Sequence, residues 1–149
     1  MSVNRVIVRK GSIEEVVRLS NEIPEFDNPH DKEVYEDRLK SKKHLIAIAQ
    51  VEGELAGFKV GYDKLGNSSF YTWMGGVLPK FRKMGVAKVL ADFQEQYAIE
   101  EGFDSVILKT RNRHKNMLHF ALKSGFEIIE VEPRVESSEN RILLKKQLK

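Results

Sequence analysis

The stretch VLPKFRKMGVAKVL, from Val77 to Leu90, connects the end of a predicted strand to the beginning of a predicted helix. It contains one proline, four basic residues and one glycine, and its apolar residues then follow helical spacing. The N-terminus of a helix carries partial positive charge, so lysine or arginine is unfavourable there unless an anion lies nearby. The stretch therefore predicts an anion-binding turn at the start of this helix.

Comparison with known phosphate-binding patterns excludes two kinds of turn. The stretch lacks both the GxxxxGK[ST] pattern of a P-loop and the GxGxxG pattern of a dinucleotide-binding turn. What remains is RxxGxA, from Arg82 to Ala87, in which Gly85 lets the backbone approach a ligand and free N–H groups point outward. Such a turn suits a pyrophosphate, and taken alone it is also typical of a solvated basic turn.

The composition of the whole chain is that of one folded domain. The chain has 149 residues, of which 41% are hydrophobic and 32% are charged. This size and balance support a single hydrophobic core. No linker rich in Pro, Gly or Ser and no internal repeat divides the sequence, so we expect one domain over residues 1–149.

Hydrophobic periodicity predicts strands and helices in α/β order. Ser12 and Glu15 form a capping-box pattern at the start of the first helix, which Pro24 ends. The Gly75-Gly76 pair inside a strand indicates a bulge or a close approach of a ligand. Strands are predicted over 5–9, 44–51, 54–63, 67–79, 105–110, 126–132 and 140–148, and helices over 13–23, 33–42, 86–101 and 114–124. This order favours an α/β fold with a mixed central sheet of about seven strands and about four flanking helices.

Several function classes are disfavoured by composition. The absence of cysteine excludes disulfides, thiolate metal ligands and a cysteine nucleophile. Since the longest apolar run, 45–49, is far shorter than a membrane span, we expect a cytoplasmic protein without a membrane partner. The net charge of +3 is spread among interleaved acids and bases, so nucleic acid is not an expected partner. His114 and His119 point to different sides of a helix, so no metal site is expected.

Three segments resemble the Gcn5-related N-acetyltransferases (GNAT). The RxxGxA string lies at the strand-to-helix junction where that family binds acetyl-CoA. VLPKF, from Val77 to Phe81, is similar to the family's hydrophobic-x-Pro-x-aromatic lead-in, and NMLHFALKSGF, from Asn116 to Phe126, is similar to its last helix. The order of predicted elements also fits along nearly the whole chain. The resemblance implies a single-domain GNAT-like fold and acetyl-CoA as co-substrate.

The resemblance also implies which residues hold coenzyme A. In the family, the fourth strand separates from the fifth and pairs with the pantetheine arm, the helix start binds the pyrophosphate, and polar residues after the fifth strand contact the arm. The corresponding residues here are Gly75, Val77, Arg82, Lys83, Gly85, Val86, Ala87, Asn112, Lys115 and Asn116. For Asn112, capping of the following helix is an equally good interpretation.

Two positions depart from the family pattern in ways that concern catalysis. The usual tyrosine, five residues before Phe126, is Ala121, so the proton donor to the leaving thiolate is absent or lies elsewhere. A thiol with a pKa of about 8.5 leaves readily as thiolate. The glutamate that some members carry eleven residues before Arg82 is replaced by Tyr71. A phenol is a poor base, so Tyr71 would orient the amine or a water, or simply pack on the sheet.

The acceptor side is predicted from the acidic loop over 25–31. Glu25, Asp27 and His30 lie where the family's acceptor pocket begins, and acidic residues there would attract a cationic amine. The same loop could also be an ordinary solvated loop.

These observations predict an acetyl-CoA-dependent N-acetyltransferase acting on a primary amine, either a small molecule or a peptide. The alternative is a non-catalytic acyl-CoA-binding or regulatory module, which the missing tyrosine and glutamate make conceivable. A homodimer is left open. The sequence carries no code for the identity of the acceptor.

Overall fold

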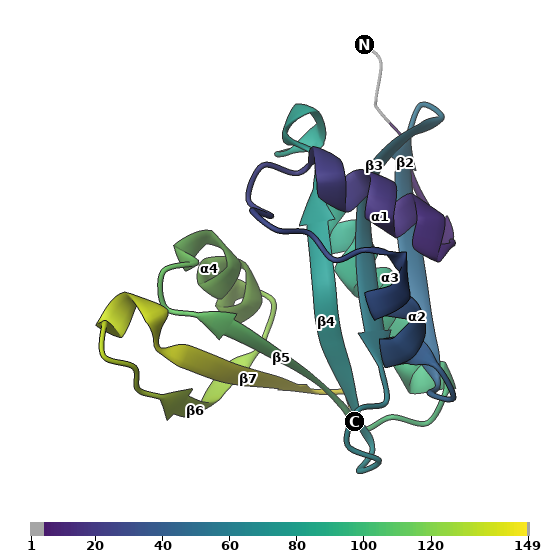
Figure 1. Ribbon diagram of the computed structural model, residues 1–149. Helices are drawn as coiled ribbons and strands as arrows, with labels where there is room; N and C mark the ends of the chain where they lie inside the picture. Colours follow the sequence, from purple (N-terminus) through teal and green to yellow (C-terminus); the bar gives the residue numbers. More distant parts are fainter. Residues whose placement is uncertain (1–4, 149) are drawn as a thin grey trace.

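The structure of the protein, a computed structural model, describes residues 5–148 as a single α/β domain (Figure 1). Its strands are β1 (Val6–Lys10), β2 (His44–Val51), β3 (Glu54–Tyr62), β4 (Ser69–Val77), β5 (Ser105–Arg111), β6 (Glu127–Glu132) and β7 (Arg141–Gln147). Its helices are α1 (Ile13–Glu22), α2 (Lys32–Leu39), α3 (Val86–Glu100) and α4 (Lys115–Lys123), with 3₁₀ turns at Pro79–Phe81 and Ser137–Glu139. The expected order of elements is confirmed.

One helix is shorter than predicted. The sequence pattern places the second helix over 33–42, whereas α2 begins after Asp31, whose side chain accepts a hydrogen bond from the Val34 N–H, and ends at Leu39. Ser41 takes a left-handed backbone conformation with φ 60°, which a continuing α-helix cannot accommodate.

All seven strands form one mixed sheet, in the order β1-β2-β3-β4-β5-β7-β6. Every neighbouring pair is antiparallel except β4 and β5, which are parallel and are joined by the crossover helix α3. The expected mixed α/β sheet is therefore confirmed, with the single parallel pair at its centre.

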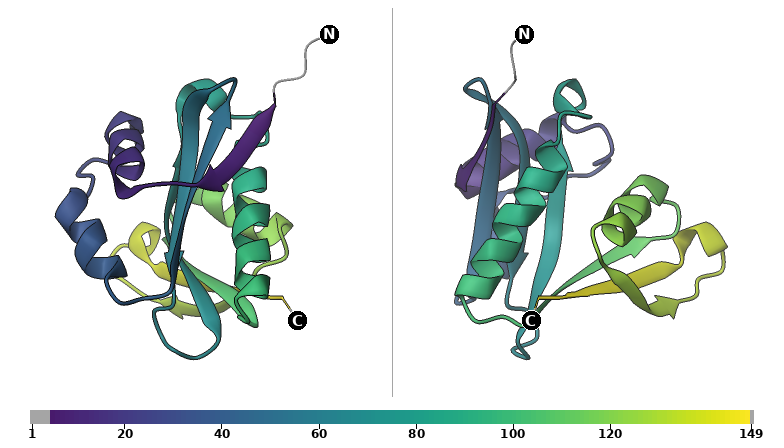
Figure 2. Two further views of the ribbon diagram at one scale, coloured as in Figure 1. Left: turned by 90° about the vertical axis from the view of Figure 1, so that its right-hand side faces the viewer. Right: turned by 180° about the vertical axis from the view of Figure 1, so that it is seen from behind.

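Helices cover both faces of the sheet and enclose two hydrophobic cores. Helices α1 and α2 lie on one face, and α3 lies on the opposite face of β2 to β4 (Figures 1 and 2). Phe58, Tyr35 and Leu19 are fully buried in the core under α1 and α2. Phe70 and Leu90 belong to the other core, which extends under α4.

The parallel strands β4 and β5 separate halfway along their length. They pair from Ser69 and Ser105 as far as Thr72 and Leu108. Beyond that point β4 continues to Val77 and β5 continues beside β7, so the two strands diverge (Figure 1). The sheet therefore opens into a V whose inner walls are the second halves of these strands.

The bulge in β4 lies at Trp73 and not at the glycine pair. Val60 opposes Met74 and Gly61 opposes Thr72, which leaves Trp73 as the extra residue at the opening of the V. The expectation of a bulge at Gly75-Gly76 is therefore wrong, because both glycines pair regularly with β3. Gly76 is instead a close-packing position, where a β-carbon would lie 2.8 Å from Ile23 Cδ1.

Candidate active site

A cavity of about 340 Å³ lies beside the second half of β4, between this strand and α4, and extends to the start of α3. It is lined by Glu25, Phe58, Lys59, Gly75, Gly76, Val77, Arg82, Ala87, Leu90, Asn116, Met117 and Phe120. The fold thus brings together five of the residues predicted for the cofactor site from β4, the turn, α3 and α4. We call this space the V cavity.

The turn before α3 exposes backbone donors to this region. Phe81 is buried and anchors the 3₁₀ turn in the core, while Lys83 and Gly85 both have left-handed backbones, with φ 64° and 83°. The first i to i−4 bond of α3 runs from the Val89 N–H to the Gly85 carbonyl. The N–H groups of the preceding helical residues, Val86 among them, therefore have no partner within the helix.

Arg82 is fixed by two partners. Its Nε donates to the Val77 carbonyl oxygen at 3.0 Å, and its two terminal nitrogens donate to the Glu25 carboxylate at 2.9 and 2.7 Å. The hydrogen bonds from Arg82 hold the pKa of Glu25 below its usual range. Since Glu25 offsets the charge of Arg82, the positive potential of the turn comes mainly from Lys83 and the free N–H groups.

These features fit a coenzyme A moiety. The V cavity offers an apolar channel along the backbone of β4, and free donors with a basic residue lie at its α3 end. A β-carbon on Gly85 would meet no atom within 4 Å, so the backbone there faces open space in which phosphates can approach.

A neighbouring cavity of about 500 Å³ lies between the loop after α1 and the segment from the end of β5 to the start of α4, and Lys115 and Asn116 are among its lining residues. Asn112 accepts a hydrogen bond from Lys115 Nζ at 2.7 Å and donates to the Ser137 carbonyl oxygen at 3.1 Å. The cap of α4 is His114, without a side-chain hydrogen bond. Asn112 therefore orients Lys115, and its interpretation as a helix cap is wrong.

Tyr71 lies on the α1 and α2 face of the sheet, opposite Tyr62 in the register of β3 and β4. The two rings meet edge to face, with centroids 5.7 Å apart. Burial raises the pKa of Tyr71, and the neighbouring Tyr62 raises it further. The phenolate is thus disfavoured, which leaves orientation of a substrate or packing on the sheet as the roles that its chemistry allows.

The three residues predicted for the acceptor side do not form one site. Glu25 lines the V cavity with Arg82. His30 stacks on Trp73, with ring centroids 5.7 Å apart, on the face that carries Tyr71. Asp27 is exposed to solvent.

Lys59 is a polar residue of the site that the sequence argument missed. It lines the V cavity and also an adjoining smaller cavity whose walls include Ala121 and Gln94. Burial lowers the pKa of Lys59 to about 8, against a smaller opposing effect of Glu95. Gln94 Oε1 is buried there without a hydrogen-bond partner among residues 5–148. A lysine inside the buried strand run AGFKVGY was the available signal.

Residues 5–148 contain no group of three or more His, Asp or Glu side chains placed to hold a metal ion, and the expectation of no metal stays a prediction. In the same part of the chain, no helix combines the length and apolar character needed to cross a membrane.

Comparison with known proteins identifies the family. Residues 13–126 match the acetyltransferase (GNAT) family. The chain is 32% identical over 123 residues to the acetyltransferase plu1384 of Photorhabdus laumondii, covering 81% of this chain and 84% of the relative. The chain belongs to the acetyltransferase (GNAT) family, as its sequence resemblance implied.

Solved structures agree with this fold. The ribosomal-protein-S18-alanine N-acetyltransferase of Escherichia coli superposes with a TM-score of 0.81 at 12% identity, covering 97% of this chain and 94% of that one. An aminoglycoside 6'-N-acetyltransferase complexed with coenzyme A superposes with a TM-score of 0.79 at 16% identity, covering 96% and 97%. At these identities the likeness concerns the fold.

Proposed function

We propose that the protein is an acetyl-CoA-dependent N-acetyltransferase that acts on a primary amine. The observation that carries the proposal is the V cavity, which joins the separated backbone of β4 to the free N–H groups at the start of α3. Membership of the GNAT family and the coenzyme A held by a structural neighbour support it.

Each part of the cavity has a role in this proposal. The N–H groups at the start of α3, together with Lys83 and Arg82, bind the pyrophosphate. The backbone of Gly75 and Val77 aligns the pantetheine arm, and Asn116 contacts it from α4. In the transfer, the carbonyl carbon of the thioester bonds to the nitrogen of the neutral amine, the carbon–sulfur bond breaks and the thiolate leaves. The nitrogen loses one proton to water as the amide forms. The amine reaches this point from the α1 and α2 face, where Tyr71 orients it.

Lys59 is the candidate proton donor to the thiolate. It shares a cavity with Ala121, the position at which the family usually carries a tyrosine. A lysine with a pKa of about 8 is protonated near neutral pH and transfers its proton more readily than an ordinary lysine. Lys59→Met is expected to lower kcat by about a hundredfold, the lower end of general-acid effects, with KM for acetyl-CoA little changed. An unchanged kcat would remove Lys59 from this role.

Calorimetric titration with acetyl-CoA tests the proposed function. Gly85→Asp places a negative charge beside the phosphate donors and is expected to abolish binding. A side chain at φ 83° is also strained, so the control must carry the same strain. Gly53→Asp is a matched control, because Gly53 has nearly the same φ, 82° against 83°, and equally open space around its missing β-carbon. Absence of binding by the wild type, or equal binding by Gly85→Asp, contradicts the proposal.

A non-catalytic acyl-CoA-binding module remains the second candidate, favoured by the alanine at position 121 and by the raised pKa of Tyr71. Thiol release measured with a panel of amines separates the two. Tight acetyl-CoA binding without turnover on any amine would favour the module.

A further inference from the structure

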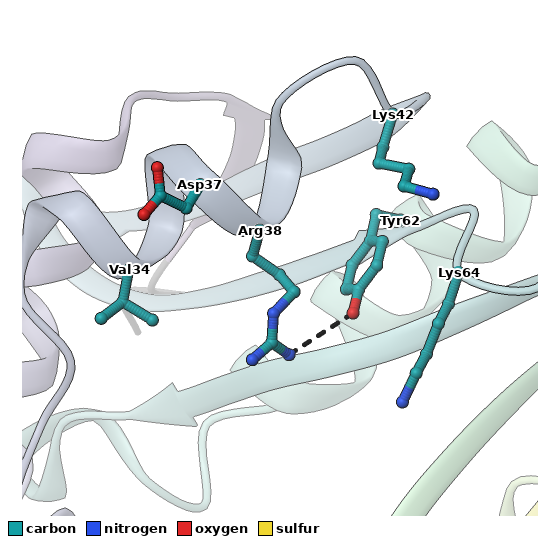
Figure 3. Close-up of a pocket in the computed structure, with 6 residues that line it drawn as sticks. All are labelled: Val34, Asp37, Arg38, Lys42, Tyr62 and Lys64. Carbon is teal, nitrogen blue, oxygen red and sulfur yellow. Dashed lines mark hydrogen bonds between the residues drawn. The ribbon is translucent and has the colours of Figure 1, made fainter.

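A separate cavity of about 480 Å³ lies on the face of the sheet that α1 and α2 cover, opposite to α3 (Figure 3). It is lined by Val34, Asp37, Arg38, Lys42, Tyr62 and Lys64, which come from α2, from the turn between α2 and β2, from the end of β3 and from the loop that follows β3. We call it the α2 cavity. Its floor is continuous with the aromatic side chains that surround Tyr71, since Tyr62 contacts both Tyr71 and Trp73.

The α2 cavity carries an excess of positive charge. Three of its six lining residues are cations and only Asp37 is an acid. In Figure 3 the Asp37 carboxylate points away from these cations, whereas Arg38 and Lys64 lie on either side of the Tyr62 ring and extend toward its hydroxyl end. Within residues 5–148, no carboxylate lies at ion-pair distance from Arg38, Lys42 or Lys64, although ten other basic–acidic pairs do form.

Aromatic rings position two of these cations. The Arg38 guanidinium lies 4.6 Å from the centre of the Trp73 ring and donates to the Tyr62 hydroxyl at 3.4 Å. Lys64 Nζ lies 4.5 Å from the centre of the Tyr71 ring. Aromatic faces attract cations without neutralising them. Both side chains thus remain charged and available to an anion that enters the cavity.

The two cations also repel one another. Burial lowers the pKa of Lys64, and the positive charges of Lys109 and Arg38 lower it further. Lys109 comes from β5, on the other wall of the V. A bound anion would relieve this repulsion, because it places opposite charge among like charges.

The position of the α2 cavity relates it to acetyl transfer. Trp73 is the bulged residue at the opening of the V, and Tyr71 precedes it on β4. An anionic group held between Arg38 and Lys64 would therefore leave the rest of a small ligand close to the point where β4 and β5 separate. A cationic ligand, in contrast, would meet three like charges there.

From this arrangement we infer that the α2 cavity binds the carboxylate or phosphate group of the acceptor, so that the substrate is a small amine that carries an anion. This inference rests on the proposed function and names its substrate class. It also reverses the expectation, drawn from the acidic loop over 25–31, that acidic side chains attract a cationic acceptor.

Binding can be measured without acetyl transfer, because Trp73 is the only tryptophan in the chain and lies against Arg38. Its fluorescence is followed during titration with β-alanine and with phosphoethanolamine, which separate carboxylate from phosphate recognition. Propylamine, which lacks an anion, and putrescine, which adds a second cation, are the comparison ligands, all at constant ionic strength. Saturable changes at millimolar concentration or below are expected for at least one anionic amine and for neither comparison ligand.

Three variants assign the effect to the cavity. Arg38→Gln and Lys64→Gln are each expected to weaken binding of the anionic amine by about tenfold or more, as for loss of a charge-assisted hydrogen bond. Lys123→Gln, an exposed position in the last turn of α4, makes the same change in net charge and is expected to leave binding unchanged. The inference is overturned if the Arg38 and Lys64 variants bind the anionic amine as tightly as the wild type does. It is also overturned if putrescine binds as tightly as the anionic amines, or if neither anionic amine changes the fluorescence.

The test is separable from that of the proposed function. Arg38→Gln is expected to bind acetyl-CoA as the wild type does, because Arg38 lies outside the V cavity. If the wild type fails to bind acetyl-CoA but its Trp73 signal still responds to anionic amines, the proposed function fails and the anion site stands. If the wild type binds acetyl-CoA but its Trp73 signal does not respond to anionic amines, only the anion site is contradicted.

Discussion

Lys59 shows how one residue can be costly to the fold and useful to the site. It is a partly exposed lysine whose amino group lies between the sheet, α3 and α4, where water is largely excluded. Its charged form is therefore less stable in the folded protein than in water, which is why its pKa falls to about 8 from 10.5. Functional sites commonly retain such destabilised groups.

Lys59→Met is expected to raise the free energy of unfolding near neutral pH by about 1–3 kcal/mol. Between pH 8 and 10.5 the unfolded chain binds more protons at this residue than the folded chain, so wild-type stability rises with pH in that window. The advantage of the variant should therefore be largest below pH 8 and shrink toward pH 10.5. Urea unfolding at several pH values measures this, with the exposed Lys40→Met as control. A gain that is independent of pH would contradict the proposed cause.

Individual roles at the site were only partly predictable. Arg82 and Gly85 were recognisable because a short local pattern specifies an anion-binding turn. Glu25 was assigned to the acceptor side, because nothing local in the sequence shows that it pairs with Arg82. Arg38 and Lys64 come from separate segments and meet only through the packing of α2 on β3, so no sequence spacing reveals them.

At the scale of elements, hydrogen bonds and an ion pair of the Glu15 carboxylate stabilise the start of α1. Ser12 Oγ accepts a hydrogen bond from the Glu15 N–H at 3.2 Å, and Glu15 accepts one from the Ser12 N–H at 3.0 Å. Glu15 also pairs with Arg9 of β1. The bond with Arg9 is the main reason why the pKa of Glu15 falls to about 2.

Acid should therefore weaken this helix start. A carboxyl with a lowered folded-state pKa stabilises the fold above its unfolded value of 4.5, and the contribution is lost as the pH falls toward 2. Glu15→Gln is expected to remove about 1–2 kcal/mol at neutral pH, after discounting for solvent screening, and to flatten the acid dependence. Unfolding by urea across this pH range measures it. Glu22→Gln, at the other end of α1, should show the wild-type acid dependence.

The cap of α1 and the strands were predictable because their signals are local. The capping box was legible in the spacing of Ser12 and Glu15, and alternating or continuous apolar runs marked all seven strands. The bulge at Trp73 was not legible, because register between β3 and β4 depends on the packing of both sheet faces. The bulge was predicted at Gly75-Gly76 because glycine inside a strand often marks a bulge, and local sequence offers no other signal.

At the scale of the molecule, the V divides the sheet into unequal parts. Strands β1 to β4 carry α1, α2 and α3, whereas β5, β7 and β6 carry α4 (Figure 2). The V cavity is lined by residues of both parts, since Gly75 belongs to β4 and Asn116 to α4. A ligand in this cavity therefore contacts both sides of the division.

Acetyl-CoA should stabilise the whole fold by an amount that rises with the logarithm of its free concentration above Kd. At a free concentration about 100 times its Kd, the expected gain in unfolding free energy is about 2.7 kcal/mol. For a domain of this size each kcal/mol raises Tm by roughly 2–4 °C. Thermal denaturation with increasing acetyl-CoA measures the shift. Gly85→Asp should show no shift, and a shift of the same size in that variant would place the ligand elsewhere.

The free donors at the start of α3 also bear on how far related sequences can diverge. A main-chain N–H is present in every residue except proline, so the donors themselves do not depend on which side chains Val86 and Ala87 carry. Gly85 is different, since its φ of 83° disfavours side chains. If these donors bind the pyrophosphate as proposed, the binding surface depends on backbone and tolerates extensive drift in side chains.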